Sequence, residues 1–335
     1  MKLPLLARIL LWPLSVLYGG YVRMRAWLYA NGWLKQKHLR AKVVSVGNLT
    51  VGGTGKTPMV LWLAEKFLAE GKRVAILSRG YRGAGGTSDE IELMKQRLRN
   101  RVEFGIGKDR FAEGHRIEQQ QHIDVFLLDD GFQHLSLARD LDIVMLDGSY
   151  RLEGQALLPA GILREPTSAI RRADMLVVTR KIKPPEIDAA LAHSFSVSYA
   201  QTRLLGFRRW GSGADSGIHD LGEIGAGPFF AFCGIGNPQA FFDDLSRWEV
   251  PVAGQSIFRD HHRYTAADLQ RLEKSAKAAG AIAFVTTEKD AENLAAGCSS
   301  TMPIFVAAID FVLTAESEFL AAMERKLQLP RGASA

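Results

Sequence analysis

Residues 48–58 read NLTVGGTGKTP, a glycine-rich stretch that contains Gly-Lys-Thr. Such a loop suits phosphate groups, because backbone N–H groups can surround an anion where no side chain blocks its approach. The N–H groups expected to face phosphate belong to Gly52, Gly53, Thr54 and Gly55. Lys56 is expected to reach the outer phosphates, and Thr57 is expected to hold Mg²⁺. The stretch therefore predicts a site for a nucleotide with Mg²⁺.

The loop departs from the usual P-loop pattern at Thr50, where that pattern has its first glycine. GGTGKT resembles the GGxGKT variant loop of a large class of P-loop ATPases and GTPases. In that variant a lysine, which dimeric ATPases use on the partner subunit, stands at the position of Val51. Valine at this position disfavours the dimeric switch mechanism.

Short apolar runs alternate with helical stretches from residue 41 onward, which predicts an α/β fold with a doubly wound, mostly parallel sheet. Most of the runs are apolar on both faces, as strands covered by helices should be. Between the first two runs, residues 56–72 carry an apolar stripe with helical spacing that ends at Gly71. The expected strands are residues 43–47, 73–77, 101–106, 123–129, 141–146 and 174–179.

A second unit with the same alternation begins near Pro228, after a stretch rich in Gly, Arg and Asp at residues 203–227. A chain of 335 residues, 47% of them hydrophobic and 23% charged, is long enough for two domains with their own cores. We therefore expect an N-terminal segment at 1–40, a P-loop nucleotide-binding domain at 41–205 and a smaller α/β domain at 206–330.

Charge and cysteine usage narrow the possible partners. The net charge of +6 is spread along the chain, whereas nucleic-acid-binding proteins usually concentrate Lys and Arg in a dense stripe. Cys233 and Cys298 lack the spacing of a zinc site or of a disulfide framework. We therefore expect no nucleic-acid partner and a reducing compartment, and the sequence predicts no protein partner.

The N-terminal segment differs in character from the rest of the chain. Residues 9–22 read ILLWPLSVLYGGYV, with Lys and Arg on both sides and aromatic residues within and after the run. The run is shorter than the ~20 residues that a membrane-spanning helix needs. Its aromatic residues and flanking cations favour a helix embedded in one leaflet, at the membrane surface. A buried helix that caps the domain is the alternative.

A second motif is predicted to supply the metal ligands. Residues 123–134 read IDVFLLDDGFQH, an apolar strand that ends in Asp129 and Asp130. The carboxyl end of a parallel strand lies at the same sheet edge as the glycine-rich loop, and carboxylate oxygens are ligands that Mg²⁺ prefers. One of the two carboxylates is therefore expected to hold Mg²⁺, directly or through water.

Several motifs together resemble one enzyme family, the tetraacyldisaccharide 4′-kinases of Gram-negative bacteria. In chain order they are VGNLTVGGTGKTP, LSRGY, LLDDGFQH, LLPAGILREP, DHHRYT and TTEKDA, and they span nearly the whole chain. The resemblance implies transfer of the γ-phosphoryl group of ATP to the 4′-hydroxyl of a tetraacyldisaccharide 1-phosphate. The product is lipid IVA, and the implied location is the cytoplasmic face of the bacterial inner membrane, as a peripheral or monotopic protein.

The resemblance also implies roles for individual residues. Lys56 and Thr57 bind the nucleotide and Mg²⁺, and Asp129 and Asp130 form the Walker B pair. Asp89 and His261, as an Asp–His pair from two domains, take the proton of the acceptor hydroxyl when the cleft closes.

The surroundings of Asp89 depart from the family pattern, because Ser88 and Ile91 replace a glycine and a proline. Asp89 as a helix N-cap therefore stays open. His262 stays open as an alternative to His261.

Three further polar residues have both a functional and a structural interpretation. Arg164, in LREP, is expected to clamp the oxygens of the transferred phosphate, and its motif makes the structural alternative, a surface ion pair, less attractive. Gln133 is expected to orient phosphate or Mg²⁺-bound water, although a structural hydrogen bond would give the same sequence. Lys289 could contact nucleotide or substrate, but a charge at a helix end is the simpler account.

Two other protein classes compete with a kinase. A membrane-attached nucleotide switch or metallochaperone of the GTPase kind needs an Asn/Thr-Lys-x-Asp guanine-recognition motif, which neither VVTRKIK nor TTEKD provides. A membrane adaptor that merely binds nucleotide has no need of Asp89 or His261. The kinase therefore accounts for more of the sequence than either alternative.

Overall fold

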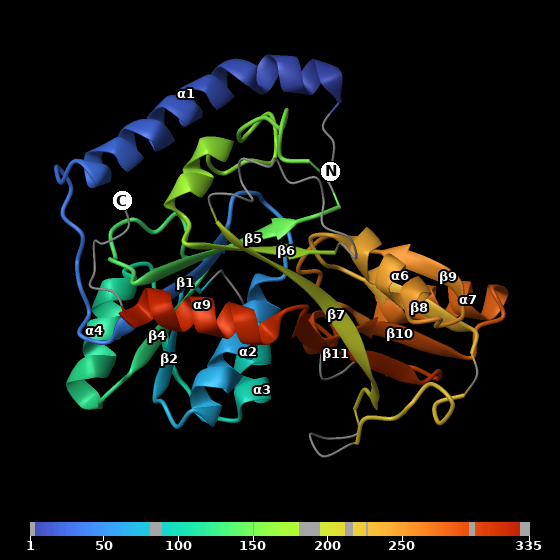
Figure 1. Ribbon diagram of the computed structural model, residues 1–335. Coiled ribbons are helices and arrows are strands. Elements are labelled where there is room, and N and C mark those ends of the chain that lie inside the picture. The colour runs from blue at the N-terminus through green and yellow to red at the C-terminus, as the bar shows by residue number, and fades with distance from the viewer. Residues whose placement is uncertain are drawn as a thin grey trace. The chain divides into compact units, whose positions relative to one another are not determined.

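The computed structural model describes residues 4–80, 89–149, 151–180, 195–211, 217–225, 227–294 and 299–328. The chain forms two compact units (Figure 1). The first unit comprises Met1–Arg82, Arg97–Gln201 and Leu313–Ala335, and the second comprises Gly83–Gln96 and Thr202–Val312.

The first unit is built on a parallel sheet. In spatial order its strands are β3 (Glu103–Ile106), β2 (Val74–Ser78), β4 (Val125–Asp129), β1 (Lys42–Asn48), β5 (Leu141–Asp147), β6 (Met175–Thr179) and the first part of β7 (Ser196–Arg209), whose remainder from Thr202 onward belongs to the second unit. Each neighbouring pair in this series is parallel. The doubly wound, mostly parallel fold predicted from the sequence is thereby confirmed.

Helices that follow the strands cover this sheet. α2 (Lys56–Ala69) contacts β1, β2 and β4, and α4 (Arg110–Gln120) contacts β2 and β3. β2 and β4 are buried along their whole length, because both faces of each strand are covered. The carboxyl ends of β1 and β4 carry the glycine-rich loop and the two aspartates, so that parallel pairing brings both motifs to one sheet edge.

The second unit also contains parallel strands. Its strands follow the order β11 (Ile304–Leu313), β10 (Ala283–Thr287), β8 (Phe229–Cys233) and β9 (Val252–Ile257). Alternate residues of β8 belong to different hydrophobic clusters, Phe229 and Ala231 to one and Phe230 and Phe232 to the other. The helices of this unit are α6 (Pro238–Arg247), α7 (Ala266–Ala278), α8 (Glu288–Glu292) and most of α3 (Asp89–Leu98).

The C-terminal helix α9 (Glu316–Gln328) packs with the first unit, whereas residues 206–330 were expected to form one domain. Its apolar face is the reason, because Phe319 is buried edge-on against Trp62 of α2 at 5.8 Å between ring centroids. Lys66 of α2 adds an ion pair to Glu316. An amphipathic helix at a chain end can join whichever unit offers it an apolar surface, and the sequence pattern does not reveal which.

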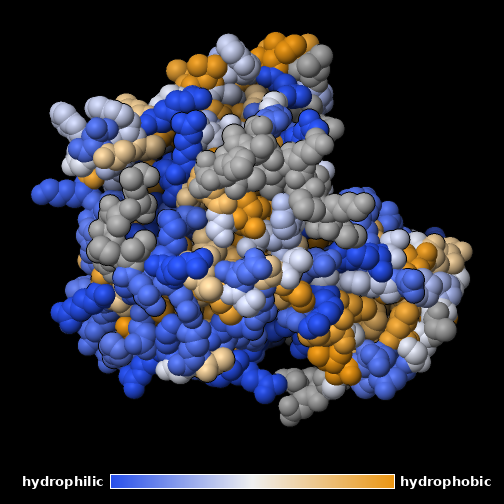
Figure 2. Space-filling model, in the orientation of Figure 1, coloured by the Kyte–Doolittle hydropathy of each residue, from blue (hydrophilic) through white to orange (hydrophobic). Residues whose placement is uncertain are grey.

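The N-terminal helix α1 (Leu5–Ala30) packs on the first unit through one narrow face. Ser15 is buried there, accepting from the N–H of Ala160 at 2.9 Å and donating to the Leu157 carbonyl at 2.9 Å. The rest of the helix exposes large apolar side chains, and Figure 2 shows hydrophobic residues at the top of the view, where α1 lies. In the part of the chain that the structure describes, no helix is both long and apolar enough to cross a membrane.

Candidate active site

The glycine-rich loop connects β1 to α2 and has backbone conformations that require glycine. Gly52 has φ +120° and Gly55, the N-cap of α2, has φ +86°, both in the left-handed region. A Cβ placed on Gly52 or Gly53 would meet no atom within 4 Å. The loop therefore presents bare backbone to open space, as a phosphate-binding loop must.

Side chains at the carboxyl end of β6 hold the carbonyl groups of this loop. Arg180 donates to the Gly53 carbonyl at 2.8 Å and forms an ion pair with Asp147, while Thr179 donates to the Thr54 carbonyl at 3.3 Å. A trans peptide directs its N–H away from its own carbonyl oxygen. The N–H groups of Thr54 and Gly55 belong to the same two peptide groups. They therefore point away from Arg180 and Thr179, to the side where an anion can bind.

Asn48, the last residue of β1, fixes the same loop from inside. Its side-chain amide donates to the Thr54 hydroxyl at 3.0 Å, and both side chains are buried. Thr54 can therefore contribute only its backbone to a nucleotide. Thr57 lies in the first turn of α2, one residue after Lys56, with a partly buried side chain.

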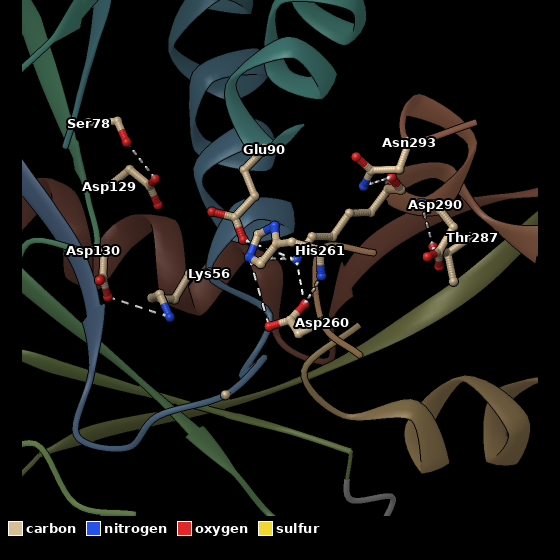
Figure 3. A network of polar contacts seen from close by, with 12 residues as sticks. Lys56, Ser78, Glu90, Asp129, Asp130, Asp260, His261, Thr287, Asp290 and Asn293 are labelled. Carbon is tan, nitrogen blue, oxygen red and sulfur yellow. Dashed lines mark hydrogen bonds and ion pairs between the residues drawn. The ribbon is translucent and has the colours of Figure 1, made fainter. Parts of the chain in front are cut away.

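The two aspartates at the end of β4 have different surroundings. Asp129 is 4% exposed and accepts a hydrogen bond from the Ser78 hydroxyl at 3.1 Å (Figure 3). Asp130 has φ +51° and turns toward cations, with Lys56 Nζ at 3.5 Å. Arg164 donates to both carboxylate oxygens of Asp130, at 2.8 and 2.7 Å.

Burial tends to raise the pKa of Asp130, but Lys56 and Arg164 outweigh it and hold the pKa below its ordinary value. Asp130 is consequently ionised and couples the loop lysine to the LREP arginine. Arg164 was predicted to clamp phosphate, and the structure places its guanidinium on Asp130, next to Lys56.

Gln133 lies close to these groups but already has protein partners. Its side-chain amide donates to the Asn48 carbonyl at 2.9 Å, and its side-chain oxygen accepts from Arg164 at 3.4 Å. The backbone carbonyls of Gln133 and Arg164 accept hydrogen bonds from α1. Arg25 donates to the Gln133 carbonyl at 2.9 Å, and Tyr18 donates to the Arg164 carbonyl at 2.8 Å. Gln133 therefore braces the loop, the arginine and α1 together.

Arg110, which no sequence motif singled out, is 6% exposed in the first turn of α4. Burial lowers the pKa of its guanidinium, and attraction to Asp130 and Asp129 opposes that shift. The helix dipole disfavours a cation in the first turn of a helix, and this unfavourable position is the sequence signal that could have identified Arg110. Arg110 is therefore an additional positive charge close to the two aspartates.

His134, the last residue of DDGFQH, orients this arginine. Arg110 NH1 lies 3.3 Å from Nδ1 and the Ser136 hydroxyl lies 3.2 Å from Nε2. Since a guanidinium can only donate, Nδ1 accepts and Nε2 carries the hydrogen. Burial, reinforced by Arg110, lowers the pKa of His134 to about 4, so the ring is neutral at neutral pH.

In the second unit, His261 and His262 have contrasting environments. His261 is exposed, has φ +57° and lies beside Asp260, whose carboxylate is 3.8 Å from Nε2. His262 stacks on Phe258 at 4.6 Å between ring centroids, and its Nε2 lies 3.2 Å from the Asp268 carboxylate. His262 is therefore packed among other side chains, whereas the side chain of His261 is 45% exposed.

Asp89 begins α3, and its side chain lies outside the described residues. Its neighbour Glu90 is described, and Figure 3 shows Glu90, Asp260 and His261 in one cluster. Lys289 of α8 contacts these groups, with Nζ at 3.7 Å from Glu90, 3.1 Å from Asp260 and 3.4 Å from His261 Nε2. The start of α3 and the histidine thus belong to one polar group in the second unit.

A strand, a glycine loop and a helix, with a loop lysine paired to the acidic end of the neighbouring strand, define a P-loop nucleotide-binding protein. A family model described as "LpxK: Tetraacyldisaccharide-1-P 4′-kinase" matches residues 7–328. The chain therefore belongs to the tetraacyldisaccharide 4′-kinase family, as its motifs suggested, and it is a kinase.

Individual relatives agree with this assignment. Proteins named tetraacyldisaccharide 4′-kinase from Geobacter sulfurreducens and Geobacter metallireducens are 37% and 39% identical to this chain. Each alignment covers 91% of this chain, with 89% and 94% of the respective relative. A crystal structure of LpxK from Aquifex aeolicus in complex with ATP is similar with a TM-score of 0.72 at 30% identity, covering 96% of this chain and 99% of that one. The switch and metallochaperone alternatives are not favoured.

Proposed function

We propose that this protein transfers the γ-phosphoryl group of ATP to the 4′-hydroxyl of a tetraacyldisaccharide 1-phosphate, forming lipid IVA in lipid A biosynthesis. The observation that carries the chemistry is the cluster of Lys56, Asp130 and Arg164 beside the glycine loop. Phosphoryl transfer depends mostly on positioning and on neutralising the charge of the phosphate oxygens. Lys56 and Arg164, which share the carboxylate of Asp130, supply that positive charge on long side chains.

The loop groups divide this work. The backbone N–H groups from Gly52 to Gly55 bind phosphate oxygens, and Lys56 exchanges its contact with Asp130 for the outer phosphates. Thr57 and Asp129 are suitable ligands for Mg²⁺, since a hydroxyl and a nearly buried carboxylate are the hard oxygen donors that this ion prefers. When bound, Mg²⁺ neutralises charge on the β- and γ-phosphates.

The acceptor side of the reaction is assigned to the second unit, which we also propose to contribute to binding the lipid. His261, with Asp89, takes the proton of the 4′-hydroxyl as the new bond to phosphorus forms. The exposed ring of His261 supports this role, because a base must reach its substrate. The ring of His262 is packed against Phe258, which also supports His261 as the base.

Label transfer from γ-labelled ATP tests the proposed reaction. The purified protein, in detergent with Mg²⁺, is incubated with a tetraacyldisaccharide 1-phosphate, and the lipids are separated by thin-layer chromatography. We expect label in a lipid that carries one additional phosphate, and none when the lipid is omitted. Release of labelled phosphate at the same rate with and without lipid, and without labelled lipid, would reject the kinase.

We further propose that α1 attaches the enzyme to the cytoplasmic surface of the inner membrane, where its lipid substrate lies. Its packing face is narrow, and most of its outer face consists of exposed apolar side chains such as Leu10, Trp12 and Leu17. Burying such side chains among acyl chains is favourable, by roughly 1.5–3 kcal/mol for each one fully buried. Cations that flank the helix are attracted to anionic headgroups.

A charge substitution on this outer face is expected to release the protein from membranes. Leu10 and Leu17 are 72% and 70% exposed, so replacing both with glutamate disturbs no internal contact but opposes insertion. Sedimentation with vesicles that contain anionic lipid should fall by at least tenfold. Lys274→Glu, on an exposed position of α7, changes the net charge equally and should leave sedimentation nearly unchanged. Equal binding by the double variant and the wild type would refute the attachment.

A further inference from the structure

We propose that Lys289 is a positioning residue for the reaction, which sets the hydrogen-bonding state of His261 and ties it to the start of α3. The inference rests on the proposed role of His261 as the acceptor-side base. Lys289 lies in TTEKDA, a motif that has no role in the proposed reaction as described above. Its side chain is only 17% exposed, whereas the side chains of Glu90, Asp260 and His261 around it are each 42–45% exposed.

The contacts of Lys289 fix which nitrogen of His261 carries hydrogen. Lys289 Nζ lies 3.4 Å from Nε2 of the ring. An ammonium has three donors and no lone pair, so Nε2 must accept and the hydrogen of the neutral ring must be on Nδ1. Lys289 therefore selects one tautomer and one ring orientation, as second partners of functional histidines commonly do.

Two carboxylates give the ammonium alternative partners. Asp260 accepts from Lys289 at 3.1 Å, and Glu90 lies 3.7 Å away. When His261 takes a proton at Nε2, the hydrogen bond from Lys289 must break, and both carboxylates can retain the lysine. Asp260 also lies 3.8 Å from Nε2, where it can stabilise the protonated ring. Because Glu90 follows Asp89 directly, the same lysine links the two residues proposed to act together.

The backbone that carries Lys289 is held rigidly. Thr287 caps α8, and the buried Asp290 accepts from the Thr287 hydroxyl at 2.6 Å and from the Tyr264 hydroxyl at 2.8 Å. Asp290 also accepts from the N–H of Gly234 at 2.7 Å, and the Gly234 carbonyl accepts from the N–H of His261 at 3.1 Å. One buried carboxylate thus anchors both the helix of Lys289 and the loop of His261. Their mutual geometry is set before any substrate binds, as precise positioning requires.

The test compares Lys289→Met with Lys289→Arg and with His261→Ala. We expect Lys289→Met to lower kcat by on the order of 10- to 100-fold, as misplaced catalytic groups do, while KM for ATP stays within about twofold. Lys289→Arg keeps the charge and the donors and should recover at least part of the loss. Lys274→Met, an exposed lysine of α7, is the matched control and should have wild-type kinetics.

A spectroscopic measurement separates positioning from general structural damage. In protein labelled with ¹⁵N-histidine, His261→Ala identifies the signals of residue 261, and the ring nitrogen shifts report the tautomer. We expect the Nδ1–H tautomer in the wild type and in Lys289→Arg, and a mixture in Lys289→Met. Wild-type turnover and an unchanged tautomer in Lys289→Met would overturn the inference.

The remaining outcomes are also decisive. If Lys289→Met does not fold, the result for Lys289→Arg decides whether Lys289 positions His261. The Nδ1–H tautomer together with turnover within about threefold of wild type supports this role. Loss of that tautomer at full turnover overturns it. If His261→Ala keeps full activity, the proposed base is wrong whatever Lys289 does. Loss in His261→Ala with none in Lys289→Met rejects Lys289 alone.

Discussion

Replacing Lys56 by methionine is expected to lower kcat/KM for ATP by on the order of 10²–10³-fold, the usual cost of removing one preorganised positive group from a site of charge transfer. Methionine has nearly the same length and keeps the apolar stem, so the loop should retain its fold. The variant removes the positive charge that lies 3.5 Å from the Asp130 carboxylate. Initial rates of label transfer at several ATP concentrations measure the effect.

The matched control is Lys72→Met. Lys72 stacks over Phe67 and pairs with Glu70 near the end of α2, away from the glycine loop of the same unit. We expect less than a twofold change in its kcat/KM. A Lys56→Met variant that is folded, as judged by its thermal transition, and yet retains wild-type kcat/KM would remove this lysine from the reaction.

Replacing His261 by alanine is expected to lower kcat by about 10²–10⁴-fold, the range that general acid–base groups contribute. Affinity for ATP should stay within about twofold, because the nucleotide-binding groups belong to the first unit and His261 to the second. His261 is exposed and its left-handed backbone is held by the Gly234 carbonyl, so truncation should disturb little else. Steady-state turnover and equilibrium binding of an ATP analogue measure the two effects separately.

Its neighbour provides the contrast. His262→Ala removes a stacked ring and a partner of Asp268, so it should reduce the free energy of unfolding by about 1–3 kcal/mol. The folded fraction should retain at least a third of wild-type turnover. If the two variants exchanged these behaviours, the base would be His262. Parallel losses of turnover and ATP affinity in His261→Ala would instead show a general loss of structure.

Most of the fold could be predicted from the sequence because its signals are local. Strands β1 to β6 overlap the expected strands within two residues, since buried parallel strands are continuous apolar runs. The strand β7 was missed, because Gln201, Arg203 and Arg209 interrupt the apolar pattern of Ser196–Arg209. The partner of α9 depended on tertiary packing against Trp62, which periodicity cannot identify.

The candidate site was predictable in its residue types but not in its pairings. Motif spacing placed Lys56 and Asp130 at one sheet edge, and the structure joins them by an ion pair. The bidentate contact of Arg164 to Asp130 was not foreseen, because residues 34 positions apart meet only through the fold. Lys289 was interpreted as a helix-end charge, since its contacts with Glu90 and His261 cross between separate elements.

The contacts of α1 bear on how freely its sequence can change. Ser15 fits between Leu157 and Ala160, and a Cβ on Gly19 would come within 2.7 Å of the Leu157 side chain. Tyr18 and Arg25 bind the carbonyls of Arg164 and Gln133, two residues beside the glycine loop. The inner face of α1 is therefore fitted to residues beside the glycine-rich loop, and we expect that an unrelated hydrophobic segment could not replace this helix. Natural variation should be tolerated on its outer face and restricted along the line through Ser15, Gly19 and Arg25.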